Sequence, residues 1–299
     1  MVQENSLKKV IVIVGPTGVG KTKLSINIAK EFNLEVINAD QSQMRKDLNI
    51  GTAKITNEEM QGVKHHLIDF LEPISEYSIK DFQDDARKII DNSNSIPLIV
   101  GGSGLYVDAL ITDYDLSIEK RDEDVEDKYK DLSNEELYNK LYLLNEEAAL
   151  KTHPNNRKRV LRYLEIVNEK GKLVDKPNVP YYESLIIFLN KPRETLYSNI
   201  NKRCEIMFED GWVDEVRKLK ENNIDINLIK EIGYRDINNY LEGFIDYNHL
   251  IDKIKKDTRH YAKRQITWFK NKMNCIEVLN DDNAYEKVYN LVENFIKKI

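Results

Sequence analysis

The first third of the chain alternates short apolar runs with segments whose apolar residues recur at helical spacing. The apolar runs lie at residues 10–14, 35–39 and 97–100, and helical patterns lie at 23–32 and around 81–92. Short buried strands that alternate with helices are typical of a parallel sheet covered by helices. The pattern predicts an α/β fold, in which ligands bind at the carboxyl ends of the strands.

The pattern changes at about residue 116, where charged and helical segments replace the strand-helix alternation. Helix is predicted over 151–169, and a loop with two prolines over 171–180. A buried strand at 185–189 and a helix from Arg193 then resume the core. We therefore predict a parallel-sheet core interrupted by a helical insertion domain: core 1–115, insertion 116–182, and core 183–299, which is mostly helical.

The segment GPTGVGKT, Gly15–Thr22, joins the first predicted strand to the first predicted helix. In this motif the glycines let backbone N–H groups point at an anion, Lys21 adds a positive charge, and the Thr22 hydroxyl can ligate Mg²⁺. A glycine turn without a ligand is the alternative interpretation. The whole loop is predicted to bind a diphosphate or triphosphate: Gly15, Pro16, Thr17, Gly18, Val19, Gly20, Lys21 and Thr22.

The remaining strand ends argue against two common partners of such a loop. GTPases identify guanine with N-K-x-D, whereas the strand at 185–189 is followed by N-K-P and then Arg193. An ATPase normally ends a strand with an acidic residue that organises Mg²⁺, but the strand at 97–100 runs into Gly101. The acidic strand end is Asp40. Gly15, Asp40 and Gly101 are predicted to converge.

Seven segments together closely resemble the tRNA dimethylallyltransferases, bacterial enzymes that isopentenylate an adenosine beside the anticodon. The likeness extends from about residue 10 to residue 269. The segments are GPTGVGKT, DQSQ (40–43), IGTAK (50–54), HHLID (65–69), GGSGLY (101–106), IGYRD (232–236) and AKRQITWF (262–269).

The resemblance implies a P-loop NTPase-like α/β fold that holds dimethylallyl diphosphate rather than ATP, and a helical insertion domain that binds the anticodon stem-loop. It also implies transfer of the dimethylallyl group to the N6 amine of the adenosine immediately 3′ of the anticodon, with Mg²⁺ as cofactor. The family usually has D-S-x-Q-x-Y where this chain has D-Q-S-Q-M-R. Asp40 and Gln43 are retained, Gln41 and Arg45 depart, and Ser103 keeps the hydroxyl of the family's G-G-T.

Three residues are predicted to act in catalysis. An adenine amine must lose a proton as it attacks, and Asp40 can accept that proton as a general base, with a helix-capping role as the alternative. Ser103 could hydrogen-bond the diphosphate or orient the amine, unless it is only a turn residue. Arg235 is the match to the family's cation that stabilises the departing diphosphate; without the resemblance it would be a solvated helix charge.

The formal net charge of −6 provides no general attraction to RNA, but two windows are locally basic. Residues 151–165 contain five Lys or Arg and one acid, and 251–272 contain eight and two. Solvated helix faces are the alternative, and Trp268 is expected in the core. The resemblance implies that both windows contact tRNA together with the loop at 40–43, where the Gln43 amide suits an adenine edge. The tRNA contacts that it predicts are Asp40, Gln41, Ser42, Gln43, Lys158, Arg159, Arg162, Lys263, Arg264 and Gln265.

Other features suggest a cytoplasmic monomer. Cys204 and Cys275 have no metal-ligand spacing, and the histidines at 65, 66 and 153 have none either, so we expect no zinc site. The first nine residues are polar, and no apolar run is long enough to span a bilayer. We therefore expect no membrane partner.

Two other functions remain open from the sequence. A small-molecule kinase would share the phosphate loop and would use an arginine-rich lid, for which 157–162 could serve. A non-catalytic RNA-binding switch would use the bound phosphate only to order its loops. Incubation with tRNA and dimethylallyl diphosphate, without ATP, distinguishes these functions.

Overall fold

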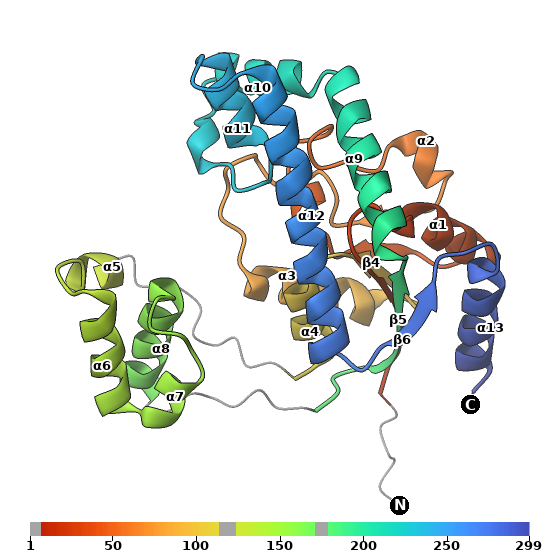
Figure 1. Cartoon of the computed structure of the whole chain (residues 1–299). Helices are drawn as coiled ribbons and strands as arrows, with labels where there is room; N and C mark the ends of the chain where they lie inside the picture. Colours follow the sequence, from red (N-terminus) through yellow and green to blue (C-terminus); the bar gives the residue numbers. More distant parts are fainter. Residues whose placement is uncertain (1–6, 114–123, 171–178, 299) are drawn as a thin grey trace, which may run out of the picture. The chain divides into compact units, whose positions relative to one another are not determined.

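The computed structural model describes residues 7–113, 124–170 and 179–298 (Figure 1). At its centre lies a six-stranded sheet of order β3-β2-β4-β1-β5-β6, in which every pair of neighbours is parallel. The predicted α/β fold is confirmed, and the pairing of β5 with β1 shows that the core resumes after the insertion. The strands are β1 (Lys9–Val14), β2 (Val36–Asn38), β3 (His65–His66), β4 (Leu98–Gly101), β5 (Glu183–Asn190) and β6 (Ile276–Leu279).

The central strand β1 is buried on both faces, as expected for a parallel sheet covered by helices. Ile11 and Ile13 pack into one hydrophobic cluster, and Val10, Val12 and Val14 pack into a second. Successive side chains of a strand point to opposite faces, so these clusters are the two sides of the sheet. Helices α1 (Lys21–Glu31), α9 (Arg193–Glu209) and α13 (Ala284–Lys297) contribute to the first cluster, and α3 (Ile79–Asn92) and α4 (Gly104–Ile111) to the second.

The longest helix, α12 (Tyr247–Lys272), contributes to both clusters. Ile254 and Ala262 lie in the first, and Phe269 lies in the second. The helix packs against α9, as Figure 1 shows, and its N-terminal half also contacts α11 (Tyr234–Leu241), which packs on α10 (Trp212–Glu221). Although α12 has 26 residues, neither it nor any other helix in the described ranges is apolar enough to cross a membrane.

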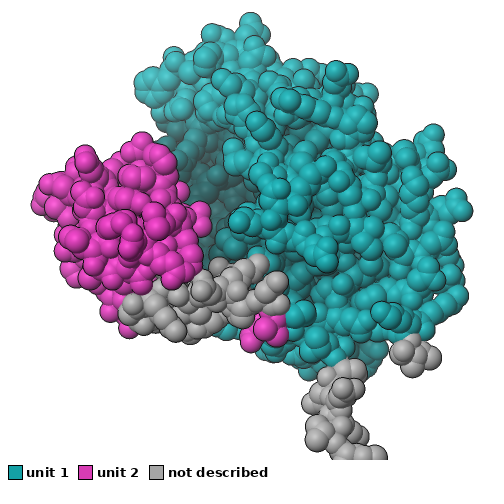
Figure 2. Space-filling view, turned by 60° about the horizontal axis from the view of Figure 1, so that its bottom comes forward, with its two compact units in different colours: residues 1–112, 180–299 teal, residues 113–179 magenta. Residues whose placement is uncertain are grey.

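The chain divides into two compact units, coloured separately in Figure 2. Unit 1 is Met1–Thr112 with Pro180–Ile299, and unit 2 is Asp113–Val179. The insertion expected at 116–182 overlaps unit 2 over most of its length. Unit 2 has its own core, which includes Leu137 and Leu164. Its helices are α5 (Asp124–Lys128), α6 (Asn134–Leu144), α7 (Glu146–Leu150) and α8 (Arg157–Lys170).

Two details of the sequence-based prediction were wrong. The predicted helix over 151–169 begins only at Arg157, because Pro154 disfavours helical backbone at the residue before it, and the chain forms a turn there. The edge strand β6 was missed within a region predicted to be mostly helical. Only Val278 of its four residues is buried, so the strand shows almost no apolar pattern.

Candidate active site

The carboxyl ends of β1, β4 and β2 bring three loops together. Strand β4 lies between the other two and pairs with both. A Cβ atom on Gly101 would lie 2.2 Å from the carbonyl oxygen of Ala39, and one on Gly102 would lie 3.5 Å from that of Gly15. The predicted convergence of the three strand ends, Gly15, Asp40 and Gly101, is therefore confirmed.

The first loop has the backbone of an anion-binding turn. Gly18 and Gly20 have φ angles of +78° and +94°, in the left-handed region that only glycine adopts without strain. Gly20 directly precedes α1, and the first turn of α1 contains no acidic side chain. The free N–H groups and the positive end of the helix dipole are thus available to an anion.

Lys21, the cation of this loop, is folded back onto it. Its Nζ donates to the carbonyl oxygens of Gly15, at 2.9 Å, and Pro16, at 3.1 Å. Burial lowers the pKa of Lys21 to about 8, Asp40 opposes this change, and Arg203 adds to it. A buried ammonium with only carbonyl partners gains from an incoming diphosphate, which supplies the opposite charge.

A second cation, Arg203 of α9, reaches the same loop and donates a hydrogen bond to the Thr17 hydroxyl. Burial lowers the pKa of Arg203, so this charge is also partly desolvated. Arg235, which the sequence indicated for this role, is exposed on α11, and its Nε donates to the carbonyl of Ile229 at 3.1 Å. Among the described contacts, Arg203 rather than Arg235 therefore provides the additional cation at the phosphate loop.

Asp40 follows β2 and combines the two roles considered for it. One carboxylate oxygen, Oδ1, accepts the N–H of Ser42 at 3.1 Å and caps the short 3₁₀ helix η1 (Gln41–Met44). Burial raises the pKa of Asp40, whereas Lys21, the Ser42 N–H and Arg203 act in the opposite direction. A carboxylate with a raised pKa is a stronger proton acceptor, and the cap bond leaves its second oxygen available.

Ser103 connects the glycine-rich loop after β4 to the loop of Asp40. Its Oγ accepts the N–H of Gln41 at 3.2 Å, and its own N–H donates to the carbonyl of Ala39 at 3.2 Å. The Gln43 side chain, by contrast, points to the loop at 50–54, where its Nε2 donates to the Ala53 carbonyl at 3.0 Å. In this structure one donor of the Gln43 amide is already engaged within the protein.

Gln265 of α12 joins two of the converging loops. Its Oε1 accepts the N–H of Thr17 at 2.9 Å, and its Nε2 donates to the carbonyl of Gly102 at 3.0 Å. The side chain was predicted to contact tRNA, but Gln265 is only 5 % exposed, and both polar atoms of its amide are used within the protein. Its position three residues after Ala262 and four before Phe269, which are both buried, is the sequence signal for an inward orientation.

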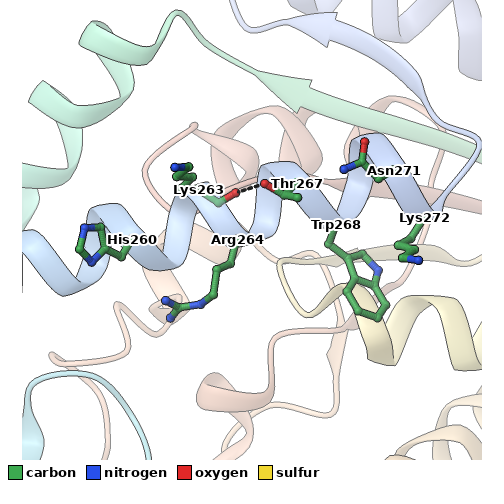
Figure 3. A pocket seen from close by; sticks show the side chains of 7 residues that line it. All are labelled: His260, Lys263, Arg264, Thr267, Trp268, Asn271 and Lys272. Atoms are coloured by element: carbon green, nitrogen blue, oxygen red, sulfur yellow. Dashed lines mark hydrogen bonds between the residues drawn. The ribbon is translucent and has the colours of Figure 1, made fainter. Parts of the chain in front are cut away.

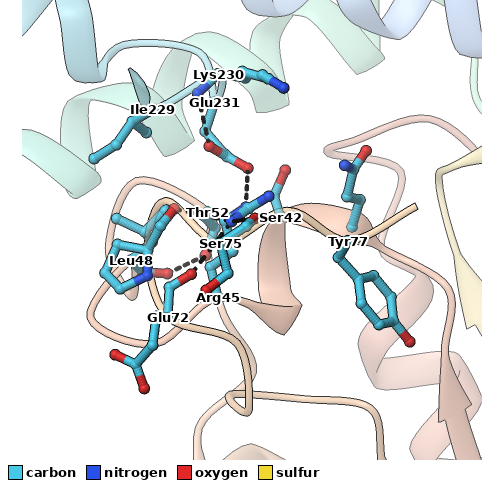
Figure 4. A network of polar contacts seen from close by, with 12 residues as sticks. Ser42, Arg45, Leu48, Thr52, Glu72, Ser75, Tyr77, Ile229, Lys230 and Glu231 are labelled. Carbon is cyan, nitrogen blue, oxygen red and sulfur yellow. Dashed lines mark hydrogen bonds and ion pairs between the residues drawn. The ribbon is translucent and has the colours of Figure 1, made fainter. Parts of the chain in front are cut away.

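Arg45, which departs from the family pattern, lies in a buried polar network (Figure 4). Its Nε pairs with Glu231 Oε1 at 3.1 Å, and both side chains are only 8 % exposed. Its Nη1 donates to the carbonyl oxygens of Pro73, at 3.0 Å, and Ser75, at 2.9 Å. The pair ties the end of η1 to the segment just before the IGYRD motif. Arg45 thus has a structural role at the position where the family usually has Tyr, and its buried charge is paired with the carboxylate of Glu231.

The IGTAK and IGYRD motifs contribute to one packed centre around Trp212. A Cβ on Gly51 or on Gly233 would lie 2.2 or 2.3 Å from the indole, so glycine is required at both positions. Glu215 then accepts three backbone N–H groups, those of residues 49, 50 and 51, and the Tyr234 hydroxyl at 2.7 Å. These motifs therefore support the loop that receives the Gln43 side chain.

The predicted RNA-contacting cations lie on helices of both units. Lys263 and Arg264 are exposed on α12, whose C-terminal half lines a cavity of about 490 Å³ (Figure 3). Trp268, expected in the core, is half-buried, and Figure 3 shows it on the same side of α12 as Arg264. In unit 2, α8 carries Lys158, Arg159 and Arg162; Arg159 Nε donates to Tyr163 Oη at 3.0 Å, and Arg162 pairs with Glu165 at 3.2 Å.

Thr22 is the residue predicted to ligate Mg²⁺ at this site. Within residues 7–113, 124–170 and 179–298, no three His, Cys, Asp or Glu side chains are grouped so that they could hold a metal ion. Thr22 is exposed at the start of α1, next to Lys21. A hydroxyl in this position suits Mg²⁺, which keeps several water ligands and takes further oxygens from a bound diphosphate.

Comparisons with known proteins identify one family. Residues 43–272 match the family model described as IPP transferase. The tRNA dimethylallyltransferase of Bacillus subtilis is 40% identical over 282 residues, which are 90% of each chain, and that of Halalkalibacterium halodurans is 40% identical over 97% of this chain and 96% of the relative.

Solved structures agree with these matches. The full-length tRNA isopentenylpyrophosphate transferase from Bacillus halodurans aligns with a TM-score of 0.74 at 39% identity, over 97% of each chain. A eukaryotic dimethylallyltransferase acting on tRNA aligns with a TM-score of 0.84 at 29% identity, over 97% of this chain and 79% of the other.

Proposed function

This chain belongs to the tRNA dimethylallyltransferase family, and from that premise we propose that it modifies the adenosine immediately 3′ of the anticodon. It transfers the dimethylallyl group of dimethylallyl diphosphate to the exocyclic N6 amine and releases diphosphate. The observation that carries the proposal is the arrangement of Lys21, Arg203 and Asp40. Two cations and one carboxylate with mutually perturbed pKa values meet where the strands end.

The cationic part of the site suits the diphosphate. As the bond between the allylic carbon and the diphosphate breaks, negative charge grows on the departing oxygens. The N–H groups of Gly18, Gly20 and Lys21, the Lys21 ammonium and the Arg203 guanidinium are suited to bind that charge, whereas the Val19 N–H donates to the Pro16 carbonyl at 3.3 Å. Mg²⁺ held by Thr22 would supply further neutralisation of the diphosphate. Lys21 begins helix α1 and Arg203 lies on helix α9, so regular secondary structure positions both cations.

Asp40 supports the other half of the reaction. The N6 lone pair is delocalised into the adenine ring, so the amine becomes an effective nucleophile only as its proton leaves. Asp40 accepts this proton through the oxygen that does not cap η1, and its raised pKa favours the transfer. Ser103, which holds the N–H of Gln41, lies beside the same loop and is suited to orient the amine.

The RNA is held by phosphate contacts from exposed cations, and the target base leaves its stack to reach the site. The exposed Lys263 and Arg264 of α12 provide such contacts in unit 1. In unit 2 the exposed Lys158 and Arg159 of α8 provide them, together with Arg162, which is half-buried and paired with Glu165. The backbone of 40–43, including Gln41 and Ser42, lines the base side of the site. We further propose that the enzyme acts as a monomer in the cytoplasm, where its tRNA substrates are.

The test uses unmodified tRNA, labelled dimethylallyl diphosphate and Mg²⁺, with no ATP. We expect label to enter the RNA at a single nucleoside, N6-dimethylallyladenosine, and no label to enter a tRNA with guanosine in place of the target adenosine. Transfer of the terminal phosphate of ATP to a small molecule, with no labelled RNA, would instead support a kinase. Binding of tRNA without transfer by the wild type would support the RNA-binding switch.

A further inference from the structure

Asn280 follows the edge strand β6 and contacts the phosphate loop. Its side-chain Nδ2 donates to the carbonyl oxygen of Val19 at 2.6 Å. A Cβ on Gly20 would lie 2.8 Å from the same nitrogen, so the amide lies against the peptide that joins Val19 to Gly20. The two hydrogen-bonded residues are 261 positions apart in the sequence, and the sheet brings them together, because β5 lies between β1 and β6 and pairs with both.

The backbone of Asn280 is attached to the end of this sheet. Its N–H donates to the carbonyl oxygen of Asn190, the last residue of β5, at 2.8 Å. The Asn190 side chain donates in turn to Glu277 Oε1 at 2.6 Å, which links β5 to β6 a second time. The amide of Asn280 therefore reaches the phosphate loop from a backbone that two strands hold in place.

The hydrogen bond from Asn280 sets the direction of one N–H group of the loop. No peptide bond in the described part of the chain is cis, and in a trans peptide the C=O and N–H point in opposite directions. The Val19 carbonyl points at Asn280, so the N–H of Gly20, which belongs to the same peptide, points away from it. Gly20 directly precedes α1, where the N–H groups of a helix start attract anions.

The preceding peptide of the loop is held in a similar way but has a different role. Asn199 of α9 donates to the Gly18 carbonyl at 3.3 Å. The N–H of that peptide belongs to Val19 and donates to the Pro16 carbonyl at 3.3 Å, so it is used within the loop. Of these two peptides, the one that Asn280 holds presents its N–H at the start of α1.

We propose that Asn280 is a positioning residue for the diphosphate, which acts by fixing the Val19–Gly20 peptide so that the Gly20 N–H faces the anion. This inference rests on the proposed function, in which that N–H binds the departing diphosphate. Glycine has wide backbone freedom, so the peptide needs a partner to keep one orientation. A donor that is already aimed at the developing negative charge stabilises it most effectively. The Asn280 amide is uncharged and contributes direction rather than attraction.

The test measures the affinity of Asn280→Ala for inorganic diphosphate with Mg²⁺, by calorimetry at a temperature where the variant is folded. We expect the affinity to fall about 10-fold, the effect of losing one well-directed hydrogen bond to a charged group. The affinity for tRNA should stay within about twofold, because exposed cations elsewhere bind the RNA. Asn280→Ser, which keeps a donor on a shorter side chain, should have an intermediate affinity for diphosphate.

Asn92→Ala is the matched control. Asn92 is the last residue of α3, and its Nδ2 also donates to a backbone carbonyl, that of Lys88, at 2.7 Å. Helix α3 packs on the opposite face of the sheet from α1, so this variant should bind diphosphate like the wild type. If both Asn280 variants unfolded at a lower temperature but bound diphosphate as tightly as the wild type, Asn280 would only satisfy a buried carbonyl, and the inference would be overturned.

Failure of the proposed function gives a different result. A wild-type protein that binds diphosphate but transfers no dimethylallyl group to tRNA would contradict the proposed function. The comparison of the Asn280 variants with the wild type needs diphosphate alone, so it would still decide whether Asn280 positions the anion-binding N–H.

Discussion

Charged side chains occupy two different settings in this protein. In the proposed reaction centre, Lys21, Asp40 and Arg203 are desolvated, interact with one another and have shifted pKa values. On α12, by contrast, Lys263 and Arg264 are exposed to solvent. Charges in a water-poor site interact strongly and with defined geometry, whereas exposed charges are screened by solvent and salt.

This difference predicts that the buried charges and the exposed charges have different functions. In the reaction centre each charge is expected to have its own role, so a single substitution should abolish most of the activity. Exposed cations act through their number, because each neutralised phosphate adds a similar small increment to RNA affinity. Substitutions that remove one charge from each setting therefore measure whether the distinction is real.

Asp40→Asn is expected to give the largest effect. Loss of the proton acceptor should lower the saturated transfer rate roughly 10²- to 10⁴-fold. Asparagine caps helices as well as aspartate, so the hydrogen bond from Ser42 can be kept. Diphosphate affinity, measured by calorimetry, should be unchanged or higher because a nearby negative charge is removed.

Asp225→Asn is the control for this substitution, since Asp225 caps another 3₁₀ helix, η2 (Ile226–Leu228), by accepting the N–H of Asn227 at 2.9 Å. It should transfer at the wild-type rate. If Asp40→Asn retained more than about a tenth of the wild-type rate, a general-base role would be untenable.

Arg203→Gln tests which cation serves the diphosphate. We expect the transfer rate to fall roughly 100-fold, the usual cost of removing one group that stabilises developing charge. Without diphosphate, the variant should unfold at a temperature no lower than the wild type, because Arg203 and Lys21 repel each other. Arg235→Gln, measured in parallel, should leave diphosphate affinity unchanged. A larger loss of diphosphate affinity at Arg235 would restore the assignment made from sequence.

These two cations also illustrate what the sequence could reveal. The phosphate loop was predictable because its eight residues are contiguous and each has a local role, and Asp40 because it directly follows a strand. Arg203 was not predictable, since its partner Thr17 is 186 positions away and a basic residue in a polar helix looks like a surface charge. Only the packing of α9 beside the loop reveals it.

The AKRQITWF segment shows the same limit among three consecutive residues. Lys263, Arg264 and Gln265 are consecutive, and sequence analysis assigned all three to RNA. Each residue advances about 100° around a helix, so neighbours face different surroundings. Lys263 and Arg264 are exposed, whereas Gln265 is buried and holds two loops together. The exposed face of a helix can be predicted from a charge-rich motif only when the positions of the neighbouring apolar residues are considered as well.

The dependence of diphosphate affinity on pH tests the role of the buried charge of Lys21 without any substitution. We expect diphosphate to bind best to protonated Lys21, whose pKa in the free protein is about 8. Below pH 8 the ammonium is present before binding; above it, binding must take up a proton, so affinity should fall about tenfold per pH unit. Calorimetry at pH 7, 8 and 9 measures this. In Arg203→Gln the fall should begin at a higher pH, because a repelling charge is gone. A constant affinity would contradict the lowered pKa.

Lys263→Gln should give the smallest effect. Which quantity changes, the salt dependence of tRNA binding or the transfer rate, is more informative than the magnitude of the change. Loss of one phosphate contact is expected to weaken tRNA binding a few-fold near physiological salt and to lower the slope of log affinity against log salt by about one. The transfer rate at saturating tRNA and the diphosphate affinity should match the wild type, since the charge is exposed and outside the reaction centre. Lys297→Gln, which removes an exposed lysine paired with Glu293 on α13, is the control and should change neither slope nor affinity. If Lys263→Gln instead lowered the saturated rate and left the salt slope intact, the exposed charge would act on the chemistry, and the division between the two settings would fail.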